Sequence, residues 1–326
     1  MPFFNAEDTL ERAIISLINQ TYLDFECILI NNNSRDKSLQ IAHYYAEKDN
    51  RIQLVNEPLQ GVVFASNKGF QKARGQFIAR MDADDEAHPE RLRLQAEFLE
   101  QNPDYGAVSG LVEYVSTRKI YKGLRKYVDW ANSVSTYDQI KTSRFIDSPI
   151  VNPTAMWRRD TAEKHGMYRP GDFPEDYEMW LRWLKNGVKI SKVPQYILKW
   201  HDSPTRLTRT HSIYSDEAFY GVKTFYLAEW LAQNNPFHPH VTIWGASKIS
   251  RKRAALLEEY GIQINGYIDI KTTRQLDKPL FYYKQIKSAG EQFILIYVRQ
   301  WHAKERIKQF LQSRNYNEGK NFLIIS

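Results

Sequence analysis

The sequence predicts an α/β protein of two domains. Short apolar segments typical of strands alternate with amphipathic segments typical of helices, first over residues 10–115 and again over residues 241–325. A polar, proline-containing segment at 233–240 separates the two patterns and indicates a linker. Such alternation is typical of a largely parallel sheet with right-handed crossovers. We therefore expect an N-terminal domain over 1–232, a linker over 233–240 and a C-terminal domain over 241–326.

The first helix and the strand that follows it have clear signals. Leu10, Ala13, Ile14 and Leu17 recur at helical spacing. The nearly continuous apolar run over 25–30 suits a strand that is buried on both faces. The later elements of this domain follow in order: helix 39–46, strand 52–55, helix 62–73, strand 76–81, a helix that Pro89 opens, and strand 106–115.

The front of this domain departs from the usual order of elements. An α/β nucleotide-binding domain ordinarily begins with a strand, whereas residues 1–5 look like the loop that follows one. We therefore expect a sheet whose first strand is missing, or an apolar strand that is encoded upstream.

The second domain repeats the α/β pattern on a smaller scale. We expect its elements in this order: strand 241–244, helix 251–260, strand 262–268, strand 293–298, helix 303–311 and strand 322–325.

The composition is that of a folded protein without disulfides or membrane spans. The 326 residues are 42% hydrophobic and 25% charged, which is ordinary for a globular chain. The single cysteine, Cys27, excludes an internal disulfide and favours a reducing compartment. No signal peptide is visible, and no apolar run reaches the roughly 20 residues that a transmembrane helix needs. We expect a cytoplasmic protein, with a peripheral position at the inner face of the membrane as the alternative.

The net charge of +7 is concentrated in the C-terminal part of the chain. Residues 237–326 hold 15 Lys and Arg against 7 Asp and Glu, whereas the rest of the chain holds 30 against 31. One interpretation is a solvated basic surface, and the other is a patch that contacts an anionic membrane. No nucleic-acid-binding motif accompanies the charge, so we do not expect nucleic acid as a partner.

The strongest chemical signal is Met81-Asp82-Ala83-Asp84-Asp85, directly after the strand predicted over 76–81. Ligands of open α/β sheets bind at the carboxyl ends of the strands. Two carboxylates one residue apart suit a hard divalent cation, which would also bind the oxygens of a substrate diphosphate. An acidic, solvated turn that leads into a helix is the alternative. The motif by itself leaves both interpretations open.

In its surroundings, this motif is part of a longer resemblance. Roughly residues 1–215 resemble the family 2 glycosyltransferases, which have the GT-A fold, a Rossmann-like mixed sheet that binds nucleotide-diphospho-sugars. The matching segments are Met1-Pro-Phe-Phe-Asn5, residues 16–26, residues 61–75, Asp82-Ala-Asp-Asp85, Asn152-Pro-Thr-Ala-Met-Trp-Arg158 and Glu175-Asp-Tyr-Glu-Met-Trp-Leu-Arg182.

The resemblance also implies how the donor is bound. Pro2 and Phe4 would pack on the base of the nucleotide, with Phe4 as the stacking face, and Asn67 would belong to the donor site. Asp82 would contact both the nucleotide and the metal. Asp84 would bind the metal, Mn²⁺ or Mg²⁺, that bridges the diphosphate.

Three further positions, Asp85, His201 and Asn32, complete the set of candidate site residues that the resemblance suggests. Asp85 looks like a supporting or helix-capping residue. His201 lies where many GT-A enzymes have another metal or diphosphate contact, although a structural hydrogen bond is the other interpretation of this residue.

Where the family usually has two acids after the second strand, this chain has three asparagines, and Asn32 takes the place of the acid that contacts the base. An amide both donates and accepts hydrogen bonds, so Asn32 still suits uracil and suits cytosine better than a carboxylate does.

Asp176 is the candidate catalytic base. Tyr177, Trp180 and Leu184 share one face of a predicted helix, which places Asp176 in its first turn. The resemblance makes Asp176 the general base that takes the proton of the acceptor hydroxyl, while the metal stabilises the departing diphosphate. An ordinary acid that compensates the helix dipole is the alternative.

The C-terminal domain resembles a Rossmann-like unit that is sometimes fused to such transferases. Its first turn has Ser247 and Ser250 where a dinucleotide-binding fingerprint has glycines, which favours a structural or docking role over cofactor binding. Asp269, at the end of the next strand, is compatible with a ribose contact but is weak evidence by itself.

Together these features predict an inverting, metal-dependent glycosyltransferase of the hexosyltransferase type. The donor would be a nucleotide-sugar and the acceptor a saccharide or lipid-linked hydroxyl, in the biosynthesis of a cell-surface polysaccharide. One alternative is a nucleotidyltransferase, which would need a glycine-rich, arginine-containing phosphate loop that the N-terminal region lacks. The other is a catalytically impaired carbohydrate-binding, nucleotide-binding or scaffold protein of the same fold.

Overall fold

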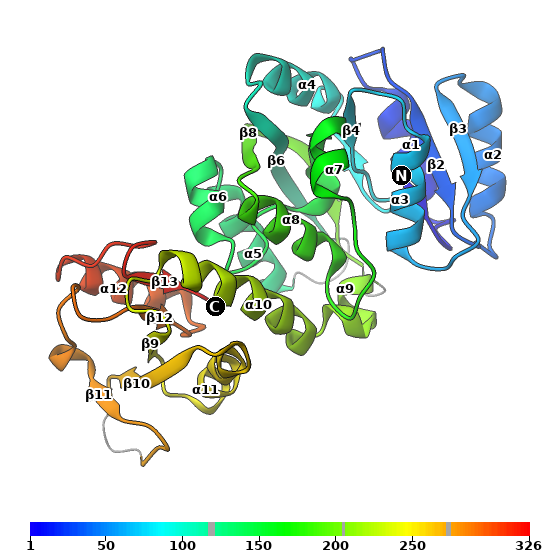
Figure 1. The fold of residues 1–326 in the computed structure, drawn as a ribbon. Helices are drawn as coiled ribbons and strands as arrows, with labels where there is room; N and C mark the ends of the chain where they lie inside the picture. Colours follow the sequence, from blue (N-terminus) through cyan, green and yellow to red (C-terminus); the bar gives the residue numbers. More distant parts are fainter. Residues whose placement is uncertain (117–120, 204–205, 272–274) are drawn as a thin grey trace. The chain divides into compact units, whose positions relative to one another are not determined.

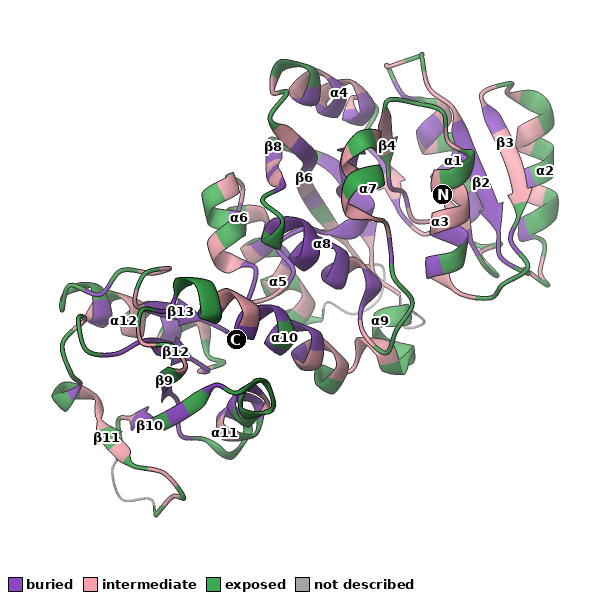
Figure 2. Ribbon diagram, viewed as in Figure 1, coloured by how far each residue is buried: buried purple, intermediate pink, exposed green. Residues whose placement is uncertain are grey.

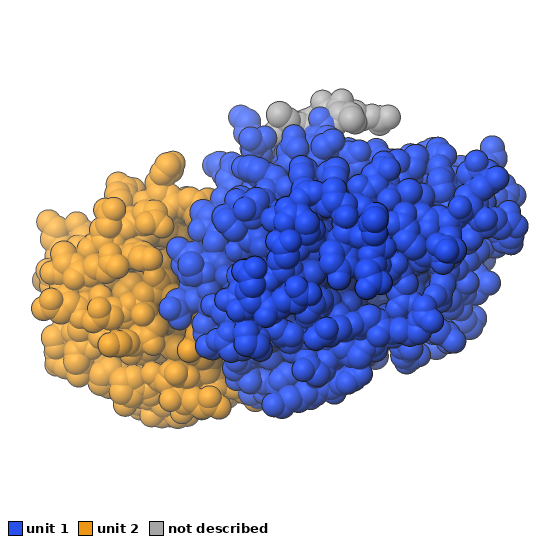
Figure 3. Space-filling view, turned by 90° about the horizontal axis from the view of Figure 1, so that it is seen from above, with its two compact units in different colours: residues 1–140, 148–212 blue, residues 141–147, 213–326 orange. Residues whose placement is uncertain are grey.

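The chain forms two compact units, which Figure 3 colours separately. The computed structural model describes residues 1–116, 121–203, 206–271 and 275–326. The first unit comprises residues 1–140 and 148–212, and the second comprises residues 141–147 and 213–326.

This division differs from the predicted boundaries at 232 and 240. Helix α10 (Asp216–Asn234) belongs to the second unit, together with the segment 141–147. Lys223 on α10 shows why, because its buried Nζ donates to the carbonyl oxygens of Ile146 and Ile325, each at 2.9 Å. The expected linker is therefore the end of α10 and the turn into β9 (His240–Trp244).

The first unit begins with a three-stranded parallel sheet in the order β1-β2-β3, of which Figure 1 labels β2 and β3. β2 (Cys27–Asn31) is buried at every position, as its apolar run predicted. The residues that predicted the first helix form the buried face of α1 (Leu10–Ile18). The other elements here are α2 (Ser38–Lys48), β3 (Ile52–Asn56) and α3 (Val62–Lys72).

The prediction that the first strand is missing was wrong. Pro2–Phe3 form a two-residue strand, β1, whose partners in β2 are Ile30 and Asn31. The main-chain oxygen of Phe3 accepts a hydrogen bond from the N–H of Asn32 at 3.0 Å, and the Phe3 ring is buried in the core. A strand of two residues is too short to show an alternating pattern, and proline contributes no N–H to the ladder.

A five-stranded mixed sheet in the order β4-β7-β6-β8-β5 follows, which confirms the expected mixed sheet. β6 (Tyr105–Val115) and β8 (Lys189–His201) form a long parallel pair in its middle. The other three strands are short and pair antiparallel: β4 (Phe77–Ala79), β5 (Glu86–Ala87) and β7 (Met156–Arg158). The helices of this part are α4 (Arg91–Gln101), α5 (Lys122–Ser133), α6 (Tyr137–Ser143), α7 (Arg159–His165), α8 (Glu175–Lys185) and α9 (Leu207–Thr210), with short 3₁₀ turns at Asn152–Thr154 and Ser212–Tyr214.

Of the helices around the mixed sheet, α8 has the largest share of buried residues, which Figure 2 shows in purple. Trp180 and Trp183 on α8 pack edge-on against each other and against Trp157 on β7, with ring centroids 5.5–6.0 Å apart. From residue 175 to residue 184 every side chain is buried except that of Asp176, which is half-buried. This packing fixes α8 and leaves one carboxylate of its first turn accessible.

The second unit confirms the predicted C-terminal α/β domain. Its five strands are all parallel, in the order β11-β10-β9-β12-β13. Its elements after β9 are α11 (Lys248–Ala255), a 3₁₀ helix (Leu256–Tyr260), β10 (Gln263–Asp269), β11 (Leu280–Tyr282), a 3₁₀ turn (Tyr283–Gln285), β12 (Ile294–Ile296), α12 (Trp301–Gln312) and β13 (Phe322–Ile324). Among the described residues, no helix combines the length and the hydrophobicity that a membrane span requires.

Candidate active site

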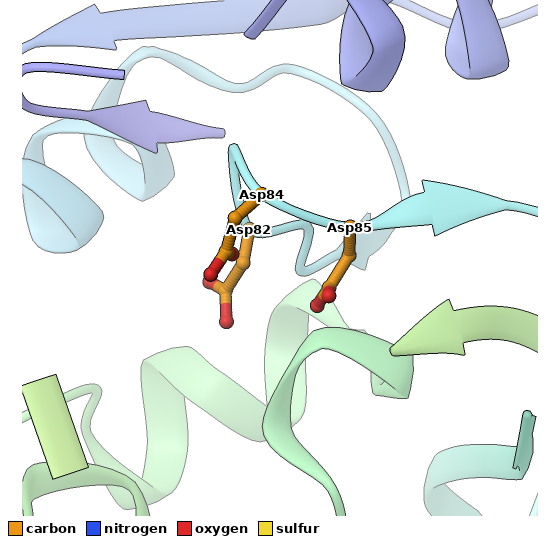
Figure 4. Close-up of side chains that lie close together, drawn as sticks. All are labelled: Asp82, Asp84 and Asp85. Atoms are coloured by element: carbon orange, nitrogen blue, oxygen red, sulfur yellow. The ribbon is translucent and has the colours of Figure 1, made fainter. Parts of the chain in front are cut away.

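Three carboxylates gather in the segment 80–85 between β4 and β5, which is called the aspartate loop below. One carboxylate oxygen from each of Asp82, Asp84 and Asp85 lies within 4.8 Å of the others. In Figure 4 the side chains of Asp82 and Asp84 lie together, and that of Asp85 points to the same side of the loop. Arg12 on α1 holds this loop, because its Nη2 donates to the main-chain oxygen of Asp84 at 2.7 Å.

The electrostatics of the aspartate loop favour a bound cation. Burial and the charge of Asp82 raise the pKa of Asp84, and burial and the charges of Asp84 and Asp82 raise the pKa of Asp85 well above its ordinary value. Asp85 is fully buried, and its Oδ2 has no hydrogen-bond partner among the described residues. Crowded carboxylate oxygens of this kind are the ligands that Mg²⁺ and Mn²⁺ prefer. The three acids therefore fit the predicted metal. Asp85 is an additional candidate ligand, which the sequence had suggested as a supporting or helix-capping residue.

Arg80 places a positive charge inside the same site. Its side chain is 7% exposed, and its Nη2 lies 2.5 Å from Oδ1 of Asp82. It also lies close enough to Glu175 and Asp176 for their charges to interact. The guanidinium of Arg80 thus contacts the aspartate loop directly and acts on the first turn of α8 through its charge.

Asp176 lies in the first turn of α8, as predicted, and its Oδ1 accepts a hydrogen bond from the N–H of Tyr177 at 2.7 Å. Burial and the charge of Glu175 raise its pKa to about 8, against the lowering effect of that hydrogen bond and of Arg80. The charge of Asp82 also acts on it. A carboxylate with a raised pKa beside a candidate metal-binding loop has the properties of a general base. The proposed base and the proposed metal ligands thus belong to one site.

Asn32 has an internal role that the sequence did not predict. Its side chain is buried, and its Nδ2 donates to the main-chain oxygens of Glu57 and Leu59 at 3.0 and 2.7 Å. Its Oδ1 accepts hydrogen bonds from the main-chain N–H of Gly61 at 2.8 Å and from the side chain of Gln60 at 3.3 Å. The amide thus holds the segment 57–61, which leads into α3. The predicted contact with the nucleotide base stays a prediction.

We expect Asn32→Asp to lower the free energy of unfolding by about 1–3 kcal/mol, because a carboxylate cannot donate to the oxygens of Glu57 and Leu59. Urea denaturation measures this change. Asn33→Asp is the matched control. Asn33 also donates to this segment, at the oxygen of Pro58, but it is exposed, so that water can replace the bond. Equal stability of the two variants would contradict the role given to Asn32.

Pro2, Phe4 and Asn67 are the other residues predicted to bind the donor. Pro2 lies in β1, and Phe4 directly follows this strand with a 49% exposed side chain that can stack on a planar ligand. Asn67 on α3 donates from Nδ2 to the main-chain oxygen of Tyr168 at 2.8 Å, and its buried Oδ1 has no partner within the described part of the chain. Tyr168 in turn hydrogen-bonds Asn152 at 3.1 Å. The donor-binding roles of Pro2, Phe4 and Asn67 stay predictions.

His201, at the end of β8, is connected to the aspartate loop through its main chain. Its N–H donates to Oδ1 of Asp85 at 2.9 Å, whereas its Nε2 lies 3.2 Å from Oε1 of Glu86. Burial lowers the pKa of the imidazole, and the hydrogen bond to Glu86 opposes that shift. The side chain is thus engaged by Glu86, and its predicted bond to the metal stays a prediction. Arg206 donates to the oxygen of His201 at 3.1 Å and stacks on Trp200.

The first turn of the second unit uses its serines for structure. Oγ of Ser247 accepts a hydrogen bond from the N–H of Ser250 and caps α11, and Oγ of Ser250 donates to the oxygen of Tyr297 at 2.8 Å. Asp269 accepts hydrogen bonds from the N–H groups of Ala246 and Ile270, so its carboxylate fastens the same turn. These contacts support the structural role that the two serines suggested.

Sequence reasoning missed Arg80, Arg12 and Tyr168. The first of these had a visible signal, since a charged residue near the end of an apolar strand and next to an acidic motif needs a buried partner. Arg12 and Tyr168 had none, because their contacts join segments that lie about 70 to 100 residues apart in the chain.

Several proteins to which this chain is similar are glycosyltransferases. The family model described as Glycosyl transferase family 2 matches residues 1–166. The O-antigen biosynthesis glycosyltransferase WbnJ of Escherichia coli is 28% identical over 217 residues, which cover 65% of this chain and 82% of that protein.

Two solved structures are similar in fold. TarS of S. aureus (residues 1–349, in complex with UDP-GlcNAc) matches with a TM-score of 0.54 and 18% identity, over 79% of this chain and 69% of that one. The mannosyltransferase PcManGT of Pyrobaculum calidifontis, in complex with GDP-Man and Mn²⁺, matches with a TM-score of 0.51 and 18% identity, over 71% and 61% of the two chains. These likenesses show the GT-A fold that the sequence predicted.

Proposed function

Because this chain belongs to glycosyl transferase family 2 and is a glycosyltransferase, we propose that it is an inverting, metal-dependent one. It moves a sugar from a nucleotide-sugar donor to a saccharide or lipid-linked hydroxyl. The observation that carries the proposal is the cluster of Asp82, Asp84 and Asp85, with Asp176 near enough for the charge of Asp82 to act on it. A metal-binding loop and a general base are the two parts that direct displacement at an anomeric carbon requires.

In the proposed reaction the carboxylate of Asp176 accepts the proton of the acceptor hydroxyl. The freed oxygen attacks the anomeric carbon from the face opposite the diphosphate, the bond to the diphosphate breaks, and the configuration inverts. A divalent cation held by Asp82, Asp84 and Asp85 would neutralise charge on the leaving diphosphate. Phe4 would stack on the base of the nucleotide.

The relatives support the donor, the metal and the biological setting. TarS was solved with UDP-GlcNAc and PcManGT with GDP-Man and Mn²⁺, which supports a nucleotide-sugar donor and a divalent cation here. WbnJ acts in O-antigen biosynthesis, which supports a role in the assembly of a cell-surface polysaccharide. The basic excess of residues 237–326 supports a peripheral contact with anionic lipid on the cytoplasmic side of the membrane.

A panel of UDP-, CDP-, GDP- and dTDP-sugars tests the proposal. We expect one nucleotide class to release its nucleoside diphosphate in the presence of Mn²⁺, slowly with water and faster with a saccharide acceptor. Asn32→Asp should leave the preferred nucleotide unchanged, because the amide of Asn32 is already used by the segment 57–61. Tight nucleotide binding without turnover of any donor would instead indicate the catalytically impaired binding protein.

A further inference from the structure

We propose that a pocket beside α1 and β5 is a saccharide-binding site, separate from the site that would bind the donor. The inference rests on the proposed function in one respect, because that function makes a saccharide the class of ligand to consider. Residues of α1, of the segment 86–89, and of β6 and β8 line this pocket, which is called the α1–β5 pocket below. Its described lining includes none of the residues predicted above to bind the donor, the metal or the acceptor hydroxyl.

The α1–β5 pocket is large enough for a short saccharide. Its volume is about 520 Å³, within the range of roughly 300–1,000 Å³ that is typical of small-molecule sites. The Oγ of Ser16 on α1 accepts a hydrogen bond from the N–H of Ala87 at 3.0 Å, which fastens α1 to β5. β5 in turn pairs with β8, with Ala87 opposite Leu198. The pocket is therefore built on paired secondary structure, so little order has to be gained when a ligand binds.

A row of three charged side chains crosses the pocket. Glu86 on β5 is the register partner of Lys199 on β8, and Lys199 is the register partner of Glu113 on β6. Register partners on adjacent strands present their side chains to the same face of a sheet. The Nζ of Lys199 lies 3.3 Å from Oε1 of Glu86, whereas Glu113 is exposed and has no hydrogen bond or ion pair among the described residues. The carboxylate of Glu113 is thus available to accept hydrogen bonds from a ligand.

Tyr196 adds an aromatic surface to these polar groups. It is 58% exposed, lines the same pocket, and makes no ring contact within the parts of the chain that the structure describes. Ile15 on α1, which is 41% exposed, adds a second apolar surface. An aromatic face packs against the C–H face of a sugar ring, while carboxylates accept hydrogen bonds from sugar hydroxyls. An exposed aromatic ring beside carboxylates is therefore a combination that recognises a saccharide.

The charge of the pocket favours a neutral ligand. Glu11, Glu86 and Glu113 line it together with Arg12 and Lys199, so that acids and cations nearly balance. A nucleotide or a lipid phosphate would face three carboxylates, which opposes the binding of an anion. A neutral saccharide, by contrast, uses its hydroxyls both as donors to the acids and as acceptors from the cations.

The α1–β5 pocket adjoins the aspartate loop. Arg12 lines the pocket, and its Nη2 donates to the main-chain oxygen of Asp84 at 2.7 Å. Glu86 directly follows the aspartate loop, and its Oε1 lies 3.2 Å from Nε2 of His201. A saccharide held in the pocket stays close to the proposed site of transfer, which raises its effective concentration there. The pocket thus retains the acceptor and takes no part in the chemical step.

The test measures the binding of three neutral trisaccharides, maltotriose, cellotriose and triacetylchitotriose, to the full chain by calorimetric titration. Direct binding requires neither a donor nor turnover, and we expect at least one of the three to bind the wild type saturably. Tyr196→Ala should weaken that binding by about tenfold, because loss of an aromatic contact costs about this much. Glu113→Gln should weaken it by about threefold, because the amide keeps an acceptor but loses the charge that strengthens its hydrogen bonds.

Two substitutions elsewhere in the first unit are the matched controls. Tyr44 on α2 is 55% exposed, Glu100 on α4 is exposed, and both lie outside the pocket. Tyr44→Ala and Glu100→Gln should bind the trisaccharide as the wild type does. Because Tyr196 and Glu113 are exposed as well, all four variants should unfold close to the wild-type melting temperature. Donor hydrolysis by water, which uses no saccharide, should be unchanged in Tyr196→Ala and Glu113→Gln.

The inference is overturned if none of the three trisaccharides binds the wild type, or if Tyr196→Ala and Glu113→Gln bind as tightly as the wild type. It is also overturned if the two control variants weaken binding as much as these two do, because binding would then not depend on the pocket. A chain that binds a trisaccharide through Tyr196 but turns over no donor would contradict the proposed function and support this site.

Discussion

Asp176→Asn is expected to lower the rate of sugar transfer by about 10²–10⁴-fold, because asparagine keeps the shape of the side chain but cannot accept the proton of the acceptor hydroxyl. The affinity for the donor should change by less than about tenfold, since the metal ligands of the aspartate loop remain. Steady-state kinetics with saturating donor and a separate titration of donor binding measure the two effects. Stability should not fall, because the substitution removes a carboxyl whose charge burial disfavours.

The pH dependence of the transfer rate should follow the protonation of Asp176. Burial and Glu175 raise the pKa of Asp176 to about 8 in the absence of a bound cation, so the base is mostly protonated below that pH. The transfer rate should therefore increase as the pH rises through the pKa of Asp176. A divalent cation bound at the nearby aspartate loop stabilises the carboxylate, so the observed midpoint with Mn²⁺ should lie below about 8.

Two further variants distinguish catalysis from helix stabilisation. Asp160 also lies in the first turn of a helix, α7, but it is exposed. If Asp176 merely compensated the helix dipole, Asp160→Asn and Asp176→Asn would have similarly small effects. If Asp176→Asn retained near-normal transfer while Glu175→Gln lost it, Glu175 would be the base.

Asp84→Asn is expected to lower transfer by at least about 10²-fold and to weaken Mn²⁺-dependent donor binding. An amide oxygen is a neutral and poorer ligand for a hard cation, and even residues that only support metal ligands contribute about 10- to 100-fold to affinity or activity. Calorimetric titration of Mn²⁺ together with the nucleoside diphosphate product measures the binding, and removal of Mn²⁺ by a chelator should abolish turnover of the wild type.

The control for Asp84→Asn is Asp129→Asn on α5. Asp129 is a surface acid, paired with Arg125 at 3.3 Å, and its loss should leave donor binding and turnover unchanged. Tight binding of the nucleoside diphosphate by wild type without metal would contradict the metal-binding role of Asp82, Asp84 and Asp85.

Much of the fold could be predicted from local sequence. Two elements show this: α1, predicted by the helical spacing of Leu10, Ala13, Ile14 and Leu17, and β2, predicted by its apolar run. Each pattern arises because one element buries its own side chains, so the pattern is visible in that element's sequence alone. β1, β5 and β7 left no such signal, because two or three residues cannot show a period. The placement of α10 with the second unit also could not be predicted, since it depends on Lys223 and distant main-chain oxygens.

The candidate site likewise has features that the sequence predicted and features that only the tertiary structure shows. Asp82, Asp84 and Asp85 are contiguous, so the sequence by itself determined that three carboxylates follow one strand, and the position of Asp176 in a first turn came from the pattern of its own helix. The tertiary structure decided that these two segments, some 90 residues apart, lie close enough for the charges of Asp82 and Arg80 to act on Asp176. It also decided that the amide of Asn32 holds the segment 57–61. The physical reason is that periodicity records which side chains avoid water, whereas the partner of a buried charge or amide is set by the packing of elements that are distant in the chain.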